Sequence, residues 1–395
     1  MVSTWSSRSS PSRWLVVAAL VVGLAGGALR LAAAAPHSFA WRLPTWLPEP
    51  IVPPDNPMSE AKVDLGRHLF YDERMSVTGT FSCASCHQQA RAFTDGLPVA
   101  IGATGERHSR NTMTLTNVAY NPVLTWANPL LTELEQQALV PMFGEHPIEM
   151  GLARREGTLL RTLRVDPAYQ RLFPIAFPGT TDPFSLANIT RALAAFQRTL
   201  LSHDSPYDRY RYRGDRAAVS DAVRRGERLF FGERLGCFHC HGGFNFSDSV
   251  RHRRLALAEI VFHNTGLYNI GGGGNYPPDN KGVYEITGRP EDMGAFRTPT
   301  LRNIALTAPY MHDGSLSTLP QVLDHYAAGG QTLHAGPHAG IGSANPYKSS
   351  FVRGFQVTAA ERSDLVAFLE SLTDETFVLD RRFASPFPPA LRDQH

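Results

Sequence analysis

All of the chain's four cysteines fall in two copies of one short pattern, CASCH at 83–87 and CFHCH at 237–241. Both copies fit C-x-x-C-H, the pattern of c-type haem attachment. Two thiols on one helical turn can reach the two vinyl groups of a porphyrin, and the next imidazole then lies beneath the iron. A zinc half-site, a redox pair and a disulfide are the alternatives. We therefore predict two covalently bound haem c groups, one held by Cys83, Cys86 and His87 and the other by Cys237, Cys240 and His241.

Residues 1–35 have the features of an export signal. Arg8 and Arg13 give a positive start, an apolar run covers 14–29, and small residues follow. The run is shorter than the roughly 20 residues that span a bilayer comfortably, although an uncleaved anchor is the alternative. We predict export to the periplasm, with membrane contact only through this segment if it is uncleaved.

The surroundings of the two motifs also repeat. GRHLFYDER at 66–74 matches GERLFFGER at 226–234, and TLTN at 114–117 resembles TLRN at 300–303. A duplication with so long a period predicts two related domains with one haem each. We expect a signal peptide over 1–35, an N-terminal cytochrome c-like domain over 36–210 and a C-terminal one over 211–395.

The pattern of the remaining chain predicts a mainly all-α fold with long Gly/Pro-rich loops. Apolar residues at 186, 189, 193, 196 and 200 lie on one face of a helix, and Thr358 with Glu361 forms a capping box before another. The length of 395 residues allows roughly two domains, and 43% hydrophobic residues suffice for a core. A net charge of +2 gives no reason to expect binding to nucleic acid.

Several longer motifs carry a family resemblance. They are AKVDLGRHLFYDERMS from residue 61, HPIEMG from 146 and FRTPTLRNIALTAPYMHDGSLSTL from 296. With the two C-x-x-C-H motifs, the chain resembles the di-haem bacterial cytochrome c peroxidase superfamily and, within it, the MauG-like branch. The segments HSFAWRLP, VPPDNPMSEAKVDLGR and LEQQALVPMFGEHPIEMG are most similar to the MbnH family. That resemblance implies a link to copper handling and the oxidation of a partner protein's tryptophan to kynurenine.

The resemblance implies that the first haem reacts with peroxide. The family's distal glutamate matches Glu149, which would act as acid/base, with Gln137 and Pro141 lining its pocket. Glu145 is the alternative carboxylate, expected to be a solvated loop charge. In the loop that closes the first haem in many relatives, alanine stands where a histidine would fall, so we expect an open, high-spin haem; His108 is expected at the surface.

The second haem requires a sixth ligand. Leu319, Val322, Leu323 and Tyr326 follow helical spacing, which places Tyr326 on a buried face and directs His325 away from it. MauG-like members carry tyrosine at this position, where conventional peroxidases carry methionine. We expect Tyr326 to bind the second iron and favour high oxidation states. In the alternative interpretation Tyr326 is core packing and Met311 or Met293 is the ligand.

The resemblance assigns the space between the haems as well. Trp126 matches the family's inter-haem tryptophan, which can carry an electron hole. The family's calcium site matches Asn111 and the carbonyl groups of Thr307 and Pro309, all hard oxygen ligands. Some MauG-like enzymes have a tryptophan that leads to the surface just before the second motif, whereas this chain has Leu235 there.

Three functions fit these residues. The first is an exported di-haem oxidoreductase in which hydrogen peroxide generates a high-valent di-haem state that oxidises tryptophan of an exported partner protein. The second is a conventional di-haem peroxidase that reduces peroxide with electrons from a small cytochrome or cupredoxin. The third is a non-enzymatic electron carrier. An open first haem with Glu149 argues against the carrier, and Tyr326 in place of methionine argues against the conventional peroxidase.

Overall fold

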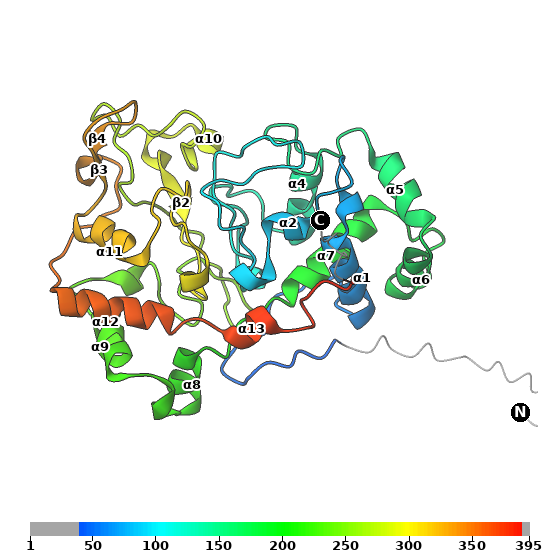
Figure 1. Cartoon of the computed structure of the whole chain (residues 1–395), viewed down its shortest axis with the longest axis horizontal. Coiled ribbons are helices and arrows are strands. Elements are labelled where there is room, and N and C mark those ends of the chain that lie inside the picture. Colours follow the sequence, from blue (N-terminus) through cyan, green and yellow to red (C-terminus); the bar gives the residue numbers. More distant parts are fainter. Residues whose placement is uncertain (1–38, 389–395) are drawn as a thin grey trace, which may run out of the picture. The chain divides into compact units, whose positions relative to one another are not determined.

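The computed structural model describes residues 39–388, and the predicted export segment at 1–35 lies outside them. Within this range the chain is mostly helical (Figure 1). The helices are α1 (Glu60–Tyr71), α2 (Cys83–Cys86), α3 (Leu134–Gln137), α4 (Leu139–Phe143), α5 (Glu156–Arg164), α6 (Pro167–Ala176), α7 (Leu186–Arg198), α8 (Pro206–Arg213), α9 (Asp221–Phe230), α10 (Tyr284–Thr287), α11 (Leu319–Ala327), α12 (Ala359–Glu370) and α13 (Glu375–Leu379). Of the helices in the described range, none has the length and apolar character needed to cross a membrane.

The strands are short and antiparallel. β1 (Phe262–Asn264) pairs with β2 (Ala295–Arg297), and β3 (Thr332–Leu333) pairs with β4 (Gly340–Ile341). Long connections separate these elements, and one of them contains the glycine-rich turn at 271–274. The expectation of a mainly helical fold is therefore correct.

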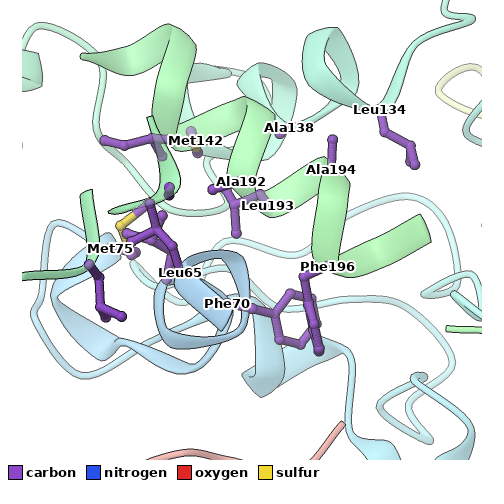
Figure 2. Packing of buried hydrophobic residues seen from close by; sticks show 14 of the residues in the cluster. Leu65, Phe70, Met75, Leu134, Ala138, Met142, Ala192, Leu193, Ala194 and Phe196 are labelled. Carbon is purple, nitrogen blue, oxygen red and sulfur yellow. The ribbon is translucent and has the colours of Figure 1, made fainter. Parts of the chain in front are cut away.

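A glycine brings α1 against α7. A Cβ atom added to Gly66 would lie 1.9 Å from the carbonyl oxygen of Ala192 and 2.9 Å from Cβ of Phe196, so only glycine fits at this crossing. The close approach allows Phe70 to pack on Phe196, with ring centroids 5.2 Å apart (Figure 2). As the apolar spacing predicted, α7 buries Ile189, and its buried face continues to the fully covered Leu200 just beyond the helix.

The same construction recurs between α9 and α12, which also cross closely (Figure 1). A Cβ on Gly226 would lie 2.0 Å from the carbonyl oxygen of Asp364 and 2.8 Å from Cβ of Phe368. The predicted capping box starts α12, because the Thr358 side chain accepts from the Glu361 N–H and the Glu361 side chain accepts from the Thr358 N–H.

Each half of the chain also contains an asparagine in an equivalent turn. Asn117 (φ 57°) and Asn303 (φ 61°) both adopt the left-handed conformation that asparagine tolerates better than most residues. Each precedes a short 3₁₀ helix and accepts a backbone N–H beyond the second long helix of its half: Asn117 from Ser202, and Asn303 from Asp374.

The two largest hydrophobic clusters divide along the chain, with one exception. The first is built mainly from residues 65–200 and the second from residues 207–372. The exception is the end of the chain, since Phe377 of α13 and Phe383 pack into the first cluster. Tyr71 Oη donates to the carbonyl of Phe383 at 2.6 Å, and Gln89 Nε2 donates to that of Asp380 at 2.8 Å. The C-terminal segment thus returns to the first half.

Candidate functional site

The histidine of each C-x-x-C-H motif is held in the same way. His87 Nδ1 lies 2.9 Å from the carbonyl oxygen of Phe93, and His241 Nδ1 lies 3.0 Å from that of Phe246. Because a carbonyl only accepts, each Nδ1 must donate, which leaves Nε2 as the free lone pair. Burial lowers the pKa of both histidines, so both rings are neutral and able to bind a metal. This is the arrangement that a proximal haem ligand needs.

Three of the four motif cysteines are buried deeply enough to remain thiols at neutral pH. Burial raises the pKa of Cys83, Cys86 and Cys237 to about 12, so these thiols are protonated at neutral pH. All four cysteines are unpaired within the described residues. Unpaired thiols beside a histidine fixed by a backbone carbonyl fit covalent attachment to a porphyrin.

A large cavity opens beside the second motif. It measures about 450 Å³ and is lined by Cys237, Cys240 and His241 together with Leu323 and Tyr326. Its lining is mainly apolar, as a porphyrin requires. The donor set and the space fit a covalently bound haem.

The cavity also contains a buried cation, Arg297, which sequence reasoning missed. Its guanidinium donates to the carbonyl oxygens of Thr125 and Thr298, both at 3.3 Å, and contacts Met113 Sδ at 3.7 Å. Burial lowers its pKa to about 10, and among residues 39–388 its hydrogen-bond partners include no carboxylate. A buried charge without a counter-ion is costly, so Arg297 is suited to pair with a carboxylate of a bound porphyrin.

Tyr326 faces this cavity from α11. Burial, with the nearby sulfur atoms of Cys240 and Cys237, raises the pKa of its phenol. Tyr326 therefore faces the cavity of the second motif, whose haem iron it is predicted to bind. Met311 lines the cavity too, whereas Met293 belongs to a neighbouring hydrophobic cluster.

As the helical spacing predicted, His325 points away from the face that carries Tyr326. His325 is only 2% exposed, because α11 is covered on that side as well by the chain around Thr265 and Gln331. It does not line the cavity. The helical spacing separated the two side chains correctly, but it did not predict that both faces are covered.

Glu149 lies in a separate, much smaller pocket together with Cys86 of the first motif. The pocket measures about 10 Å³, close to the space that one water-sized molecule needs. Burial raises the pKa of Glu149 to about 7. A carboxyl group with this pKa exchanges protons readily at neutral pH, which suits a general acid/base.

The backbone around Glu149 is tightly fixed. Its carbonyl accepts the Ala103 N–H at 2.6 Å, in the loop where many relatives carry a histidine. A Cβ atom on Gly102 would lie 1.9 Å from the carbonyl oxygen of Ile148, so this loop packs directly on the motif. Ala103 thus occupies a position next to Glu149 without bringing a metal ligand.

Of the other residues discussed for the first haem, only His108 lines the small pocket with Glu149. Pro141, in α4, accepts the N–H of Met150 at 2.9 Å, but neither Pro141 nor the half-buried Gln137 is among the residues that line the small pocket. Glu145 is exposed, as expected. His108, expected at the surface, is half-buried and lines the pocket with Glu149.

Trp126 and the predicted calcium ligands lie together along the large cavity. Trp126 Nε1 donates to the carbonyl of Asn111 at 2.8 Å. The amide nitrogen of Asn111 donates to the carbonyl of Leu97 at 2.7 Å, which leaves its Oδ1 available. Thr307 and Pro309 line the same cavity. These oxygen groups fit a hard cation such as calcium.

A further pair lies beside the second motif. His263 Nε2 and Asp248 Oδ2 are 2.6 Å apart, and both side chains lie close to Cys240. Burial alone would lower the pKa of His263, but its contacts with Asp248 and Cys240 raise the pKa to about 10. No sequence motif distinguished either residue.

Comparison with known proteins agrees with this arrangement. Residues 60–217 match the family model for di-haem cytochrome c peroxidase. The chain is 35% identical over 337 residues to methylamine utilization protein MauG of Methylorubrum extorquens, covering 85% of this chain and 84% of MauG. It is 36% identical over 348 residues to cytochrome-c peroxidase IdrP1 of Denitromonas iodatirespirans, covering 83% and 85%.

A solved structure is similar over nearly the whole chain. It is the crystal structure of a MauG-like protein associated with microbial copper homeostasis, with 49% identity and a TM-score of 0.87, covering 89% of this chain and 100% of that one. The chain therefore belongs to the di-haem cytochrome c peroxidase family that includes MauG. It is an oxidoreductase of the di-haem peroxidase type, with haem c as its cofactor and peroxide as its substrate.

Proposed function

We propose that this protein uses hydrogen peroxide to oxidise a tryptophan of an exported partner protein to kynurenine, in connection with copper handling. The observation that carries the proposal is the position of Tyr326, whose phenol faces the cavity of the second motif beside Cys237 and Cys240. A hard, anionic oxygen ligand stabilises oxidised iron, whereas a thioether stabilises reduced iron. The similarity to a MauG-like protein associated with copper homeostasis supports the proposed link to copper handling.

The first site is proposed to receive peroxide and the second to store oxidising power. When bound, the two haems supply the iron chemistry that consumes peroxide and holds the oxidising equivalents. Glu149 takes a proton from the entering peroxide and returns it to the leaving oxygen, for which a pKa of about 7 is well suited. Its buried pocket admits little more than one small molecule and thereby limits side reactions with bulk water.

Residues between the two sites are proposed to connect them. Trp126 lines the large cavity, and its indole is fixed by the hydrogen bond to Asn111. Asn111, with the carbonyls of Thr307 and Pro309, is proposed to bind calcium. Such a cation would hold the Asn111 backbone and so fix the orientation of the Trp126 ring.

We also propose the cellular and evolutionary setting. The N-terminal segment directs export, and the mature protein acts in the periplasm, where covalent haem attachment takes place. The two halves derive from one duplicated cytochrome c-like domain, with their boundary in the segment 202–220. The equivalent glycine crossings at Gly66 and Gly226, and the equivalent turns at Asn117 and Asn303, support the duplication.

A conventional peroxidase is the second candidate, and one observation favours it. Met311 lines the cavity of the second motif, so a thioether is present near Tyr326. With methionine as ligand, the second haem would accept electrons from a small cytochrome or cupredoxin. A simple electron carrier is less well supported, because it has no need of a carboxyl group with a pKa of about 7 beside its first haem.

The test is to add stoichiometric hydrogen peroxide to the purified di-haem protein with candidate exported partners, then to analyse both proteins by mass spectrometry. The proposal expects a mass change at a partner tryptophan that matches conversion to kynurenine. Turnover of peroxide only with an added electron-donor protein, and no change in any partner, would instead establish the conventional peroxidase.

A further inference from the structure

A stacked pair of aromatic side chains lies outside the cavity that Tyr326 lines. The rings of Trp46 and Tyr212 have centroids 3.9 Å apart and are inclined by only 8°. Trp46 is half-buried and belongs to the segment before α1, whereas Tyr212, on α8, is 36% exposed. The two residues are 166 positions apart in the sequence. Together they reach from the half-buried Trp46 to the solvent-exposed Tyr212.

The segment that carries Trp46 is firmly held. Its neighbour Leu47 is 2% exposed, and the carbonyl of Pro48 accepts the buried Tyr120 hydroxyl at 2.6 Å. Arg254 donates to the carbonyl of Thr45 at 2.9 Å. Trp46 is therefore a fixed part of the molecule, as a group that transfers electrons must be.

A short series of contacts connects this pair to the second motif. The carbonyl of Phe246 accepts from His241, the proximal histidine of that motif, at 3.0 Å. The guanidinium of Arg302 lies 5.7 Å from the ring centroid of Phe246 and 5.7 Å from that of Trp46. Arg302 thus lies close to both rings and links Trp46 to the residue whose carbonyl holds His241.

The surroundings of Trp46 are compatible with reversible oxidation. A cation over an indole opposes its oxidation, but Arg302 is paired with Asp208 through hydrogen bonds of 2.7 and 3.0 Å. The indole N–H of Trp46 is buried and has no acceptor among residues 39–388. An oxidised indole that keeps its proton needs only an electron to recover.

We propose that Trp46 and Tyr212 form a relay through which electrons pass between a partner protein at the surface of α8 and the second haem site. The proposal rests on the proposed function, which supplies the oxidant. It also explains how the chain functions with Leu235, which is 7% exposed, at the place where some relatives carry a surface-leading tryptophan.

The electrons balance with the proposed reaction. In each transfer one electron moves from an oxidisable side chain of the partner to Tyr212, then to Trp46 and onward to the second haem site. Oxidised Tyr212 releases its phenol proton to solvent and regains a proton when it is reduced. Two transfers match the two electrons, taken up with two protons, that convert one hydrogen peroxide into two water molecules. Conversion of one tryptophan and two water molecules into N-formylkynurenine releases four electrons and four protons, so it takes four transfers and two molecules of hydrogen peroxide. Hydrolysis of the formyl group then gives kynurenine and formate.

The test locates the radicals directly and requires no partner. The intact di-haem protein is treated with stoichiometric hydrogen peroxide in the presence of the radical trap 2-methyl-2-nitrosopropane. Cleavage before aspartate then yields residues 208–214 as one peptide, in which fragmentation separates Tyr212 from Tyr210. The variants are Trp46→Phe and Tyr212→Phe, which preserve ring packing, and the matched controls are Trp41→Phe and Tyr210→Phe. Haem absorbance checks that each variant is intact and reacts with peroxide.

We expect a trap adduct on Tyr212 that falls at least about tenfold in Trp46→Phe and is unchanged in Trp41→Phe and Tyr210→Phe. An adduct on Tyr212 that is unaffected by Trp46→Phe overturns the relay, as does an oxidised wild-type protein with no adduct on Trp46 or Tyr212. If peroxide leaves the haem spectrum of the wild-type protein unchanged, the proposed function itself is wrong, and the relay is wrong with it.

Discussion

The regions around the two C-x-x-C-H motifs share the same backbone arrangement but differ in the side chain that lies opposite each motif. Each has a helix crossing that only glycine permits, an asparagine turn and a histidine fixed by a backbone carbonyl. Across from the first motif, Glu149 lies in a pocket of about 10 Å³; across from the second, Tyr326 faces a cavity of about 450 Å³. In the proposed function this scaffold holds two similar cofactors, and the side chain that faces each one gives it a different chemistry.

The largest effect is expected from making the second site like that of a conventional peroxidase. Tyr326→Met should abolish tryptophan oxidation and raise the reduction potential of the second haem, because a thioether replaces an anionic oxygen. Both haems should remain attached, since Cys237 and Cys240 are unchanged. Redox titration and mass spectrometry of the partner measure the two effects. Met311→Leu is the control, and loss of activity in this control but not in Tyr326→Met would identify Met311 as the ligand.

The next effect concerns the first site. Glu149→Gln keeps the shape of the side chain but removes its titratable proton, so the reaction with peroxide should slow by roughly 10²–10⁴-fold. Stopped-flow absorbance measures this rate. Glu145→Gln, an exposed carboxyl four residues earlier, should react at the wild-type rate. An unchanged rate in Glu149→Gln would exclude this residue as the acid/base.

The shared scaffold can be tested through its glycines. Gly66→Ala and Gly226→Ala should each lower the free energy of unfolding by about 1–3 kcal/mol or more, because the new methyl group meets a backbone carbonyl. Gly157→Ala, at an exposed position in α5, should be neutral or stabilise by up to about 1 kcal/mol. Thermal and urea unfolding measure the differences. Tolerance of either buried substitution would mean that the crossing is looser than the structure indicates.

The smallest expected effect is a dependence on pH. The pKa of Glu149 is about 7, and its ionised form accepts the proton from peroxide. The rate of reaction with peroxide should therefore be constant above pH 7 and fall about tenfold for each pH unit below it. The Glu149→Gln variant should lack this step. A wild-type profile that is flat between pH 5 and 8 would contradict the assignment.

The features that were predictable from sequence are those encoded by local patterns. The apolar spacing of 186–200 predicted α7, the pair Thr358 and Glu361 predicted the start of α12, and the position of Tyr326 on its helix follows from the helical period. Glu149 was assigned through the family resemblance of its motif, and its role remains a prediction.

The features that were missed depend on contacts between distant parts of the chain. Arg297, the pair of His263 and Asp248, and the stack of Trp46 on Tyr212 have no motif of their own, and only tertiary packing brings their surroundings together. The burial of His325 was not predicted for the same reason, since the segments that cover it are joined to α11 by loops without a regular period.

The return of the C-terminal segment to the first half affects how the protein could be divided. A single cut in the segment 202–220 would leave the first fragment without Phe377 and Phe383, and with Tyr71 and Gln89 deprived of their carbonyl acceptors. In the second fragment, the same two phenylalanines would be exposed to solvent. A mono-haem protein made from the first half therefore needs residues 375–384 grafted back, and a circular permutant that rejoins them is the more natural starting point for engineering.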